Sequence, residues 1–343
     1  MYFRTFLGFF ILFIYFAFLS AIPIAKSSKL FVLKGRAQGT TYSIKYVDSS
    51  EALSQKGIDS VFNLFDQSLS IYNPLSLISS LNKKKKEAIL DDHLLKIIEF
   101  ADSLGKASNN TFNIKMLPLL NAWGFKNSKV NEFRDSNNIK QILEFEVNKK
   151  HKINGLSIYK STRKLQFDID GIAQGYCVDY LSNLLLSKGI KNFIVEIGGE
   201  VFANGTDEHG RQWRVGIQDV NYLLGNKNSE DLVISLDNQG ITTSGKFQKY
   251  KKIGDSIISH VLDPRTGYPV KNDLVSVTVL AKNAMLADGL DNAFMVMGIK
   301  ETMKWLEKNP NIGVYMVYRK KDGSLADTAN GYFKNQMFYT ESN

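Results

Sequence analysis

Two segments decide how the chain is organised: HVLDPRTGYP at residues 260–269 and AMLADGLDNAFMVMG at residues 284–298. The first segment combines histidine, aspartate and arginine with proline and glycine, a composition typical of turns. The second has apolar residues at helical spacing, and Asp288, Asp291 and Asn292 fall on one face because they lie three and four positions apart. Carboxylates on a rigid helix beside a rigid polar loop predict a site that holds a hard cation near an anionic substrate.

The composition is that of a folded, globular protein. The chain has 343 residues, of which 44% are hydrophobic and 22% charged, enough for one large or two ordinary domains. Its net charge of +9 fits an anionic ligand, a membrane surface or a generally lysine-rich sequence, and the scattered lysines favour the last. The four-lysine run at 83–86 has no interleaved aromatic residues, so it predicts a solvated loop rather than a nucleic-acid site. Cys177 is the single cysteine, so no intramolecular disulfide is possible.

The N-terminus has the pattern of an export signal. Residues 6–24 carry no charge, Arg4 precedes them, and Ala21 and Ala25 offer small residues for cleavage. We therefore predict that residues 1–25 are a signal peptide or, because the apolar run is long, a retained membrane anchor. No cysteine follows the run, which argues against a bacterial lipoprotein. We expect a short linker at 26–36 and a mature protein that works outside the cytoplasmic membrane.

Apolar periodicity predicts short strands mixed with a few helices. The strongest strand patterns are TTYSIKYV at 40–47 and LVSVTVL at 274–280, and a hairpin is expected from 156–159 and 164–167. The segment 111–125 is apolar but interrupted by proline, which favours a buried loop. Helices are expected at about 50–65, 91–106, 180–188, 284–298 and 301–308, and the glycines at 171 and 175 predict that 168–179 turns tightly or approaches a ligand. Runs of short strands joined by turns, with a few helices, predict an α+β fold with largely antiparallel sheet.

Common catalytic signatures are absent from the sequence. It contains no P-loop, no G-x-G-x-x-G, no G-x-S-x-G and no cysteine–histidine cluster suited to zinc. Of the four histidines, His260 alone lies in a constrained loop. Acids in glycine-rich turns, such as Asp168, Asp170 and Asp263, favour Mg²⁺ or Ca²⁺ over softer metals, although a single carboxylate is more commonly a cap or a surface charge. The residue pattern by itself names no reaction.

A series of eight motifs resembles one known family. In order they are GTTYSI at 39, SIYNPLS at 70, PLLNAWGF at 118, DIDGIAQGYCVD at 168, EIGGEVFANG at 196, TTSG at 242, HVLDPRTGYP at 260 and ADGLDNA at 287. Together they resemble the ApbE-type FAD:protein FMN transferases over nearly all of the mature chain. The resemblance implies one domain at 37–340 with an ApbE-type, T-fold-like α+β fold of largely antiparallel sheets and packed helices.

The resemblance also implies a reaction. FAD would bind with Mg²⁺, a threonine hydroxyl of a target protein would attack the FMN phosphorus, and AMP would leave. The acceptor would be a flavin subunit of an exported redox complex, which places the protein in the periplasm, anchored to the inner membrane if its N-terminus is retained. Two alternatives use the same site: an FAD pyrophosphatase that releases FMN and AMP, and a non-catalytic exported FAD-binding protein.

The family motifs assign roles to individual residues. His260 would assist the attacking hydroxyl or the phosphate, and Asp179 and Arg265 would brace loops. Mg²⁺ would be held by Asp288, Asp291, Asn292 and the backbone at Gly171. Contacts with FAD would come from Gln38, Tyr72, Thr111, Phe112, Asn113, Asp168, Gln174 and Leu262.

The chain departs from the family pattern at five positions. Asn113 and Lys115 replace the usual aspartate and threonine, Gln174 replaces a lysine, Asn292 replaces a threonine, and Leu77 replaces a glutamate. The Asn292 amide oxygen can still bind Mg²⁺. Asn113 and Lys115 fall where the flavin is expected, so they are expected to change its specificity or weaken its binding.

Overall fold

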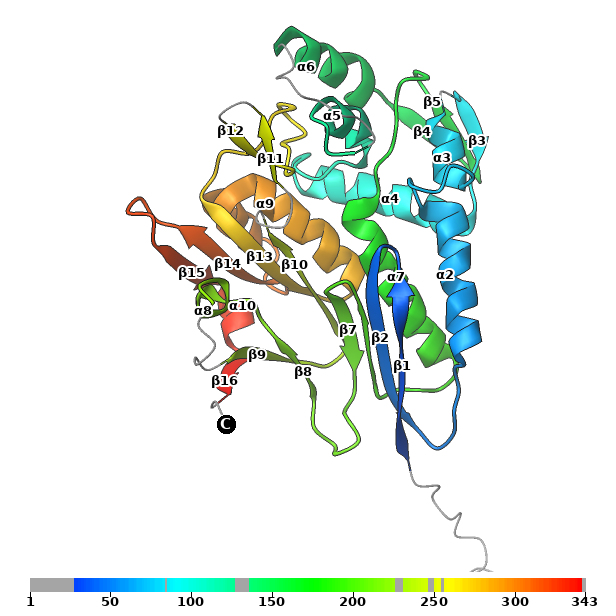
Figure 1. Ribbon diagram of the computed structural model, residues 1–343, viewed down its shortest axis with the longest axis vertical. Helices are drawn as coiled ribbons and strands as arrows, with labels where there is room; N and C mark the ends of the chain where they lie inside the picture. Colours follow the sequence, from blue (N-terminus) through cyan, green and yellow to red (C-terminus); the bar gives the residue numbers. More distant parts are fainter. Residues whose placement is uncertain are drawn as a thin grey trace, which may run out of the picture.

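An eight-stranded, fully antiparallel sheet organises the structure, a computed structural model that describes residues 28–83, 85–126, 136–225, 231–245, 250–253 and 256–340 (Figure 1). Its strands, in spatial order, are β1 (Lys29–Ala37), β2 (Thr40–Asp48), β6 (Phe193–Ile197), β7 (Glu200–Asn204), β10 (Gln239–Gly245), β13 (Leu274–Ala281), β14 (Gly313–Arg319) and β15 (Leu325–Ala329). The predicted α+β class with largely antiparallel sheet is confirmed. The predicted export segment, 1–25, lies outside the described residues.

Two long helices cover one face of this sheet. Helix α7 (Asp170–Ser187) packs against β6 and β7, and α9 (Ala284–Leu306) packs against β10 and β13. The helices also pack on each other at Gly175, where a Cβ would lie 2.6 Å from the Ala284 carbonyl oxygen. Only glycine permits that approach, and it brings the start of α7 onto the acidic turn of α9.

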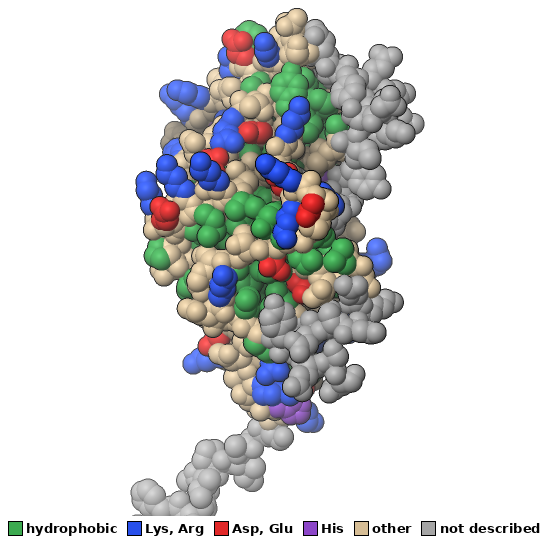
Figure 2. All heavy atoms as spheres, turned by 90° about the vertical axis from the view of Figure 1, so that its left-hand side faces the viewer, with side chains coloured by type: hydrophobic (Ala, Val, Ile, Leu, Met, Phe, Trp, Pro, Cys, Tyr) green, Lys and Arg blue, Asp and Glu red, His purple; other side chains and the backbone are tan. Residues whose placement is uncertain are grey.

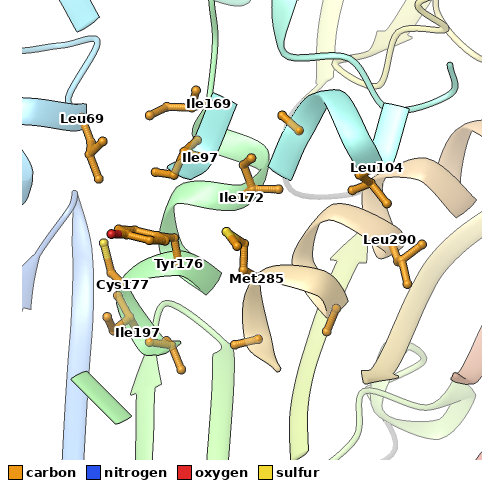
Figure 3. Packing of buried hydrophobic residues seen from close by; sticks show 14 of the residues in the cluster. Leu69, Ile97, Leu104, Ile169, Ile172, Tyr176, Cys177, Ile197, Met285 and Leu290 are labelled. Atoms are coloured by element: carbon orange, nitrogen blue, oxygen red, sulfur yellow. The ribbon is translucent and has the colours of Figure 1, made fainter. Parts of the chain in front are cut away.

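The main hydrophobic core lies between these helices, the sheet and α4 (Asp92–Ala107) (Figure 3). Tyr176 and Cys177 of α7, Met285 and Leu290 of α9, and Leu104 of α4 are all buried in it. A second cluster, which includes Val201, Ile241 and Leu280, lies where the sheet meets β8 (Trp213–Gly216) and β9 (Asp231–Leu236). Because layers pack on both faces, β13 is buried almost throughout, as its apolar sequence requires.

A mostly helical block lies beside the first strands. It contains α2 (Gln55–Leu69), α3 (Leu77–Asn82), α4, the 3-10 helix η1 (Ile114–Met116), α5 (Leu117–Ala122), α6 (Ser136–Ile142), the π-helical η2 (Leu143–Val147) and a small sheet of β3 (Glu87–Ile89), β5 (Ser157–Lys160) and β4 (His151–Asn154). Side chains at the helix starts accept backbone N–H groups; Ser54, Ser76 and Asp91 do so for α2, α3 and α4.

The smaller elements complete the chain. They are α8 (Val220–Leu223), β11 (Tyr250–Ile253), β12 (Ser256–Ser259), α10 (Gly331–Lys334) and β16 (Met337–Thr340). No helix among the described ranges has the length and apolar character needed to cross a membrane. Figure 2 shows lysine and arginine side chains spread over one face with acidic and apolar groups among them, which agrees with a generally lysine-rich surface.

Several expectations about local structure were wrong. The predicted linker at 26–36 is largely strand β1, which pairs with β2 over its whole length through a tight Gln38–Gly39 turn with φ of 51° and 76°. The hairpin expected from 156–159 and 164–167 is formed instead by β4 and β5. Residues 164–167 do not form a strand, because the Asn82 side chain takes up both the N–H and the carbonyl of Phe167. The expected loop at 111–125 contains two short helices, η1 and α5.

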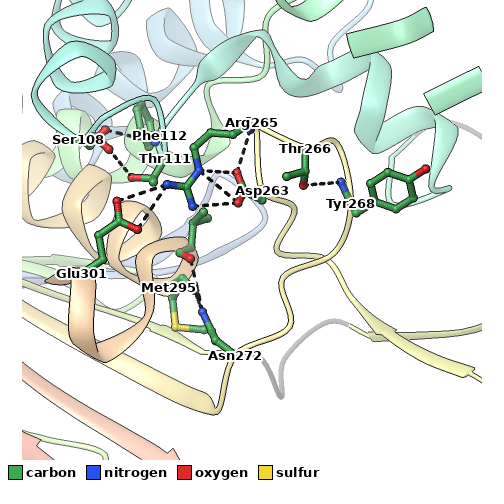
Figure 4. Close-up of polar contacts among 11 residues, drawn as sticks. Ser108, Thr111, Phe112, Asp263, Arg265, Thr266, Tyr268, Asn272, Met295 and Glu301 are labelled. Carbon is green, nitrogen blue, oxygen red and sulfur yellow. Dashed lines mark hydrogen bonds and ion pairs between the residues drawn. The ribbon is translucent and has the colours of Figure 1, made fainter. Parts of the chain in front are cut away.

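Element α9 spans both helices expected at 284–298 and 301–308, which meet at a kink. Its only break is Gly298, which has φ of 73° and ψ of 173°. The Asn272 side chain donates to the Met295 carbonyl at this break (Figure 4). The first helical stretch therefore ends at this glycine and a second one follows it, as expected from the sequence.

Candidate functional site

The first turn of α7 and the second turn of α9 bring the four predicted metal residues together. Asp288 Oδ2 accepts the Gly175 N–H at 3.0 Å. The Asn292 amide nitrogen donates to the Gly171 carbonyl at 3.3 Å, to the Asp288 carbonyl at 2.9 Å and to Asp291 Oδ1 at 3.1 Å. Ser244, in the TTSG motif of β10, donates to the same Asp291 oxygen at 2.9 Å. Two carboxylates and one amide of α9 therefore converge with one carbonyl of α7, and Ser244 of β10 supports them.

The two carboxylates are fully enclosed, which makes their ionisation costly. Burial raises the pKa of Asp288 to about 7, and Asp179 and Asp170 add to the increase while the Gly175 N–H opposes it. Burial, followed by the nearby Asp288, raises the pKa of Asp291 well above its usual range. A bound cation would offset this cost. Among the described residues no three histidine, cysteine or acidic side chains form a metal site by themselves, so any such site also uses the amide and the carbonyl.

The N-terminus of helix α9 is fixed by hydrogen bonds to Asp179 of α7 and to its own N-cap residue, Asn283. Asp179 accepts the N–H groups of Ala284 at 2.8 Å and Met285 at 3.0 Å, and Asn283 accepts the N–H of Leu286. These bonds satisfy the free donors of the first turn. The predicted bracing role of Asp179 agrees with these contacts, which fix the acidic turn relative to α7.

A pocket of about 800 Å³ opens at the start of α7, where Asp170, Ala173 and Gln174 line it. It lies between the β1–β2 turn, α2, the loop at 70–76 and the start of α7, and three predicted flavin residues, Gln38, Tyr72 and Gln174, line it. Gln38 Nε2 donates to Cys177 Sγ at 2.7 Å, which fixes the β1–β2 turn over α7. The Tyr72 side chain is 62% exposed and is available for contact with a planar ring.

The other predicted flavin residues lie outside this pocket. Thr111 and Phe112 are buried and bonded to Ser108, and the Phe112 ring lies near Gly171. Asn113 caps η1 by accepting the Lys115 N–H at 2.9 Å and lines a separate pocket of about 340 Å³. Leu262 is buried among the side chains that pack around α5 and α6.

The two departures at 113 and 115 have local structural roles. The Lys115 ammonium donates to the Lys149 carbonyl at 3.2 Å, and burial lowers its pKa, with Asp102 acting in the opposite direction. Neither Asn113 nor Lys115 lines the 800 Å³ pocket. These contacts account for both residues without a flavin.

The 260–269 loop is rigid because its polar groups bond to one another and to α9. Arg265 forms an ion pair with Asp263 at 2.9 Å and reaches Glu301 of α9 at 3.3 Å (Figure 4). The Gly267 N–H donates to the Asp263 carbonyl, and its own carbonyl accepts the Trp123 indole N–H. The predicted bracing role of Arg265 agrees with these contacts. His260 lies at the start of this loop, with its ring edge-on to Phe125 at 6.4 Å between centroids.

Lys126 was not anticipated from the sequence. Its ammonium lies 3.2 Å from Asp168 Oδ2, contacts Asp170 Oδ2, donates to the Tyr72 hydroxyl at 3.0 Å and lies 5.3 Å from the Tyr72 ring centre. Burial opposes its charge, but the two aspartates outweigh that effect and raise its pKa. Burial and Asp170 raise the pKa of Asp168 to about 6, against the opposing effect of Lys126. Lys126 thus links two predicted flavin residues, Tyr72 and Asp168.

The chain is similar to known proteins over most of its length. The model of the ApbE family matches residues 38–316. FAD:protein FMN transferase from Haemophilus influenzae is 28% identical over 335 residues, covering 92% of this chain and 94% of the relative. The protein of the same name from Buchnera aphidicola subsp. Schizaphis graminum is 31% identical over 345 residues, covering 97% of each.

Solved structures agree with this relationship. Flavin transferase ApbE from Vibrio cholerae superposes with a TM-score of 0.78 at 29% identity and covers 90% of this chain and 99% of its own. The apo form of the Pseudomonas stutzeri flavinyl transferase ApbE superposes with a TM-score of 0.81 at 27% identity, with coverage of 90% and 97%.

Proposed function

The chain belongs to the ApbE family and is a transferase, and we propose that it transfers FMN from FAD to a threonine hydroxyl of an acceptor protein, releasing AMP in a Mg²⁺-dependent reaction. The observation that carries this proposal is the meeting of Asp288, Asp291, Asn292 and the Gly171 carbonyl beside the pocket lined by Tyr72. That arrangement offers a cation site next to a cavity large enough for part of a dinucleotide.

The donor set fits Mg²⁺ because it consists of oxygen atoms without a thiolate or an imidazole. Asp288, Asp291 and the Gly171 carbonyl would hold the ion, together with Asn292 once its amide is turned over to present Oδ1. When bound, Mg²⁺ would neutralise the pyrophosphate of FAD and help the AMP phosphate to leave. The protein's own task is then to position the reactants, which supplies most of the catalysis in phosphoryl transfer.

The remaining roles follow the layout of the site. Gln38, Tyr72 and Gln174 would contact FAD in the pocket, with Asp168 at its edge through Lys126. His260 would assist the attacking hydroxyl or the phosphate from the braced loop, a role that requires its ring to lie within hydrogen-bond distance of the proton. Thr111, Phe112, Asn113 and Leu262 stay proposed FAD contacts, and none of them lines this pocket.

A transfer assay tests the proposal. The purified protein is incubated with FAD, Mg²⁺ and a panel of threonine peptides, each matched with a copy in which alanine replaces threonine. We expect a mass increase corresponding to FMN on threonine peptides only, with equimolar AMP and no reaction after chelation of Mg²⁺. FMN and AMP formed without any peptide would identify a pyrophosphatase, and tight FAD binding without turnover would identify a binding protein.

We also propose that the protein acts in the periplasm on a flavin subunit of an exported redox complex. The support is the charge-free run at 6–24, which either serves as a cleaved signal or remains as an inner-membrane anchor. N-terminal sequencing of the mature protein, after fractionation of the cell envelope, distinguishes cleavage from anchoring. Recovery of the protein in the cytoplasm would contradict the proposed location.

Replacing Lys126 with methionine is expected to weaken FAD binding about tenfold, or about 1.4 kcal/mol, with a smaller effect on turnover. Without the ammonium, Asp168 and Asp170 repel each other, the pKa of Asp168 rises further, and the Tyr72 hydroxyl loses its donor while keeping its own bond to Asp170. Quenching of flavin fluorescence measures the dissociation constant. Lys126→Arg keeps the charge and serves as the matched control, and an unchanged FAD affinity in Lys126→Met would contradict the role.

A further inference from the structure

We propose that Arg36 binds a phosphate group of the ligand that enters the 800 Å³ pocket, at the wall of that pocket formed by β1. The inference deepens the proposed function and rests on it for the identity of the ligand, FAD. The first of the eight family motifs begins at 39, so the sequence assigned no role to Arg36. The support comes from the place of Arg36 in the pocket wall and from the bonding of the other charged side chains there.

Arg36 is held at the pocket by a fixed stretch of backbone. It lies in β1 opposite Thr41 of β2, one pair before the end of the hairpin. The Gln38 side chain fastens the turn of this hairpin to Cys177 of α7 at 2.7 Å. Arg36 lines the pocket together with the turn, while α2 and the start of α7 supply other walls (Figure 1). Its position relative to a bound ligand is therefore set by the sheet and not by a loose loop.

The acids that line the same pocket are already engaged by neighbouring side chains. They are Asp59, Asp66 and Asp170, which accept hydrogen bonds from Gln55, Asn73 and Tyr72 at 3.0, 2.9 and 2.7 Å. Asp170 also forms an ion pair with Lys126. The Arg36 guanidinium, the remaining charged group of the lining, has no hydrogen bond or ion pair with any residue that the structure describes. Its positive charge is therefore available to a ligand.

The chemistry of this wall selects a phosphate. A guanidinium is always charged and offers five N–H donors in one plane, which matches two oxygen atoms of a phosphate. The three acids come from α2 and α7, so they repel an anionic group on their side of the pocket, and Arg36 attracts it on the β1 side. Sugar and ribityl hydroxyls suit the acidic side instead, because they can donate to carboxylates. The pocket thus favours a nucleotide that turns a phosphate toward Arg36.

The test compares ligands that differ only in phosphate. Binding of FAD, of FMN against riboflavin, and of ADP against adenosine is measured by calorimetry for the unmodified protein and Arg36→Gln, without any acceptor. We expect Arg36→Gln to bind FAD and the phosphate-bearing member of at least one pair about five- to tenfold more weakly. Riboflavin and adenosine should bind both proteins equally. Added salt should weaken FAD binding to the unmodified protein more steeply than to the variant.

Two matched variants complete the test. Lys34→Gln removes an exposed charge two positions earlier on the same face of β1, outside the pocket lining, and should leave FAD affinity unchanged. Arg36→Lys keeps the charge but loses the planar pair of donors, so it should recover part of the affinity.

Two results would overturn the inference while leaving the proposed function intact. One is an unchanged FAD affinity in Arg36→Gln. The other is an equal loss of affinity for riboflavin and FAD, which would show that Arg36 shapes the pocket without recognising a phosphate. An unmodified protein that binds no FAD would contradict the proposed function and the inference together. Because no acceptor is present, a phosphate-specific loss supports the inference even if no transfer is found.

Discussion

Asp288→Ala is expected to reduce FMN transfer at least about a thousandfold, because it removes a carboxylate at the centre of the cation site. Stabilisation of developing charge by a bound ion contributes several kcal/mol, and each 1.4 kcal/mol corresponds to about tenfold in rate. The loss should be visible as missing AMP release and a missing mass increase on the acceptor. Asp288 also accepts the Gly175 N–H, so alanine leaves that donor without a partner as well.

Two control variants distinguish the effect of losing the negative charge from the effect of disturbing the fold. Asp288→Asn keeps an oxygen that can accept the Gly175 N–H while removing the charge, so it should fold and still lose most of the activity. Asp322→Asn changes an acid that accepts hydrogen bonds from Ser324 in the exposed turn between β14 and β15, and it should retain full activity. Full Mg²⁺-dependent transfer by a folded Asp288→Asn protein would rule out the assigned metal site.

His260→Ala is expected to lower the turnover number between about 100- and 10,000-fold, the usual range for loss of a general base or acid. The affinity for FAD should change by less than about threefold, because Gln38, Tyr72 and Gln174 remain in place in the pocket. Steady-state kinetics and fluorescence titration measure the two quantities separately. Free imidazole added to the variant should restore part of the turnover if the missing side chain transfers a proton.

A substitution elsewhere in the 260–269 loop serves as the control for His260→Ala. Arg265→Lys removes the paired contacts with Asp263 and Glu301 but leaves the histidine, so it should lower turnover less than His260→Ala. An effect of His260→Ala confined to FAD affinity would assign the histidine to binding instead of chemistry.

The meeting of Asp288, Asp291 and Asn292 on one helix face was largely predictable from the sequence, whereas the groups around them were not. Asp288, Asp291 and Asn292 share a helix face whatever the rest of the chain does, and the DIDGIAQG and HVLDPRTGYP motifs are short and distinctive. The fold class also followed from local patterns, because LVSVTVL at β13 and TTYSIKYV at β2 have strong strand character.

The missed features depend on contacts between distant segments. Lys126 meets Tyr72 and Asp168 across 54 and 42 positions of sequence, and nothing in its local surroundings distinguishes it from a surface lysine. Strand β1 was taken for a linker because its pattern is weak alone, and pairing with β2 stabilises it.

The most direct measurement of the central claim is the intact mass of an acceptor peptide after incubation with FAD, with and without Mg²⁺. With the unmodified protein and Mg²⁺, we expect the mass to increase by FMN less water on the threonine peptide and not on its alanine copy. Chelation of Mg²⁺ or Asp288→Asn should abolish the increase. Release of FMN and AMP at the same rate without any peptide, with no mass change on the threonine peptide, would contradict the claim.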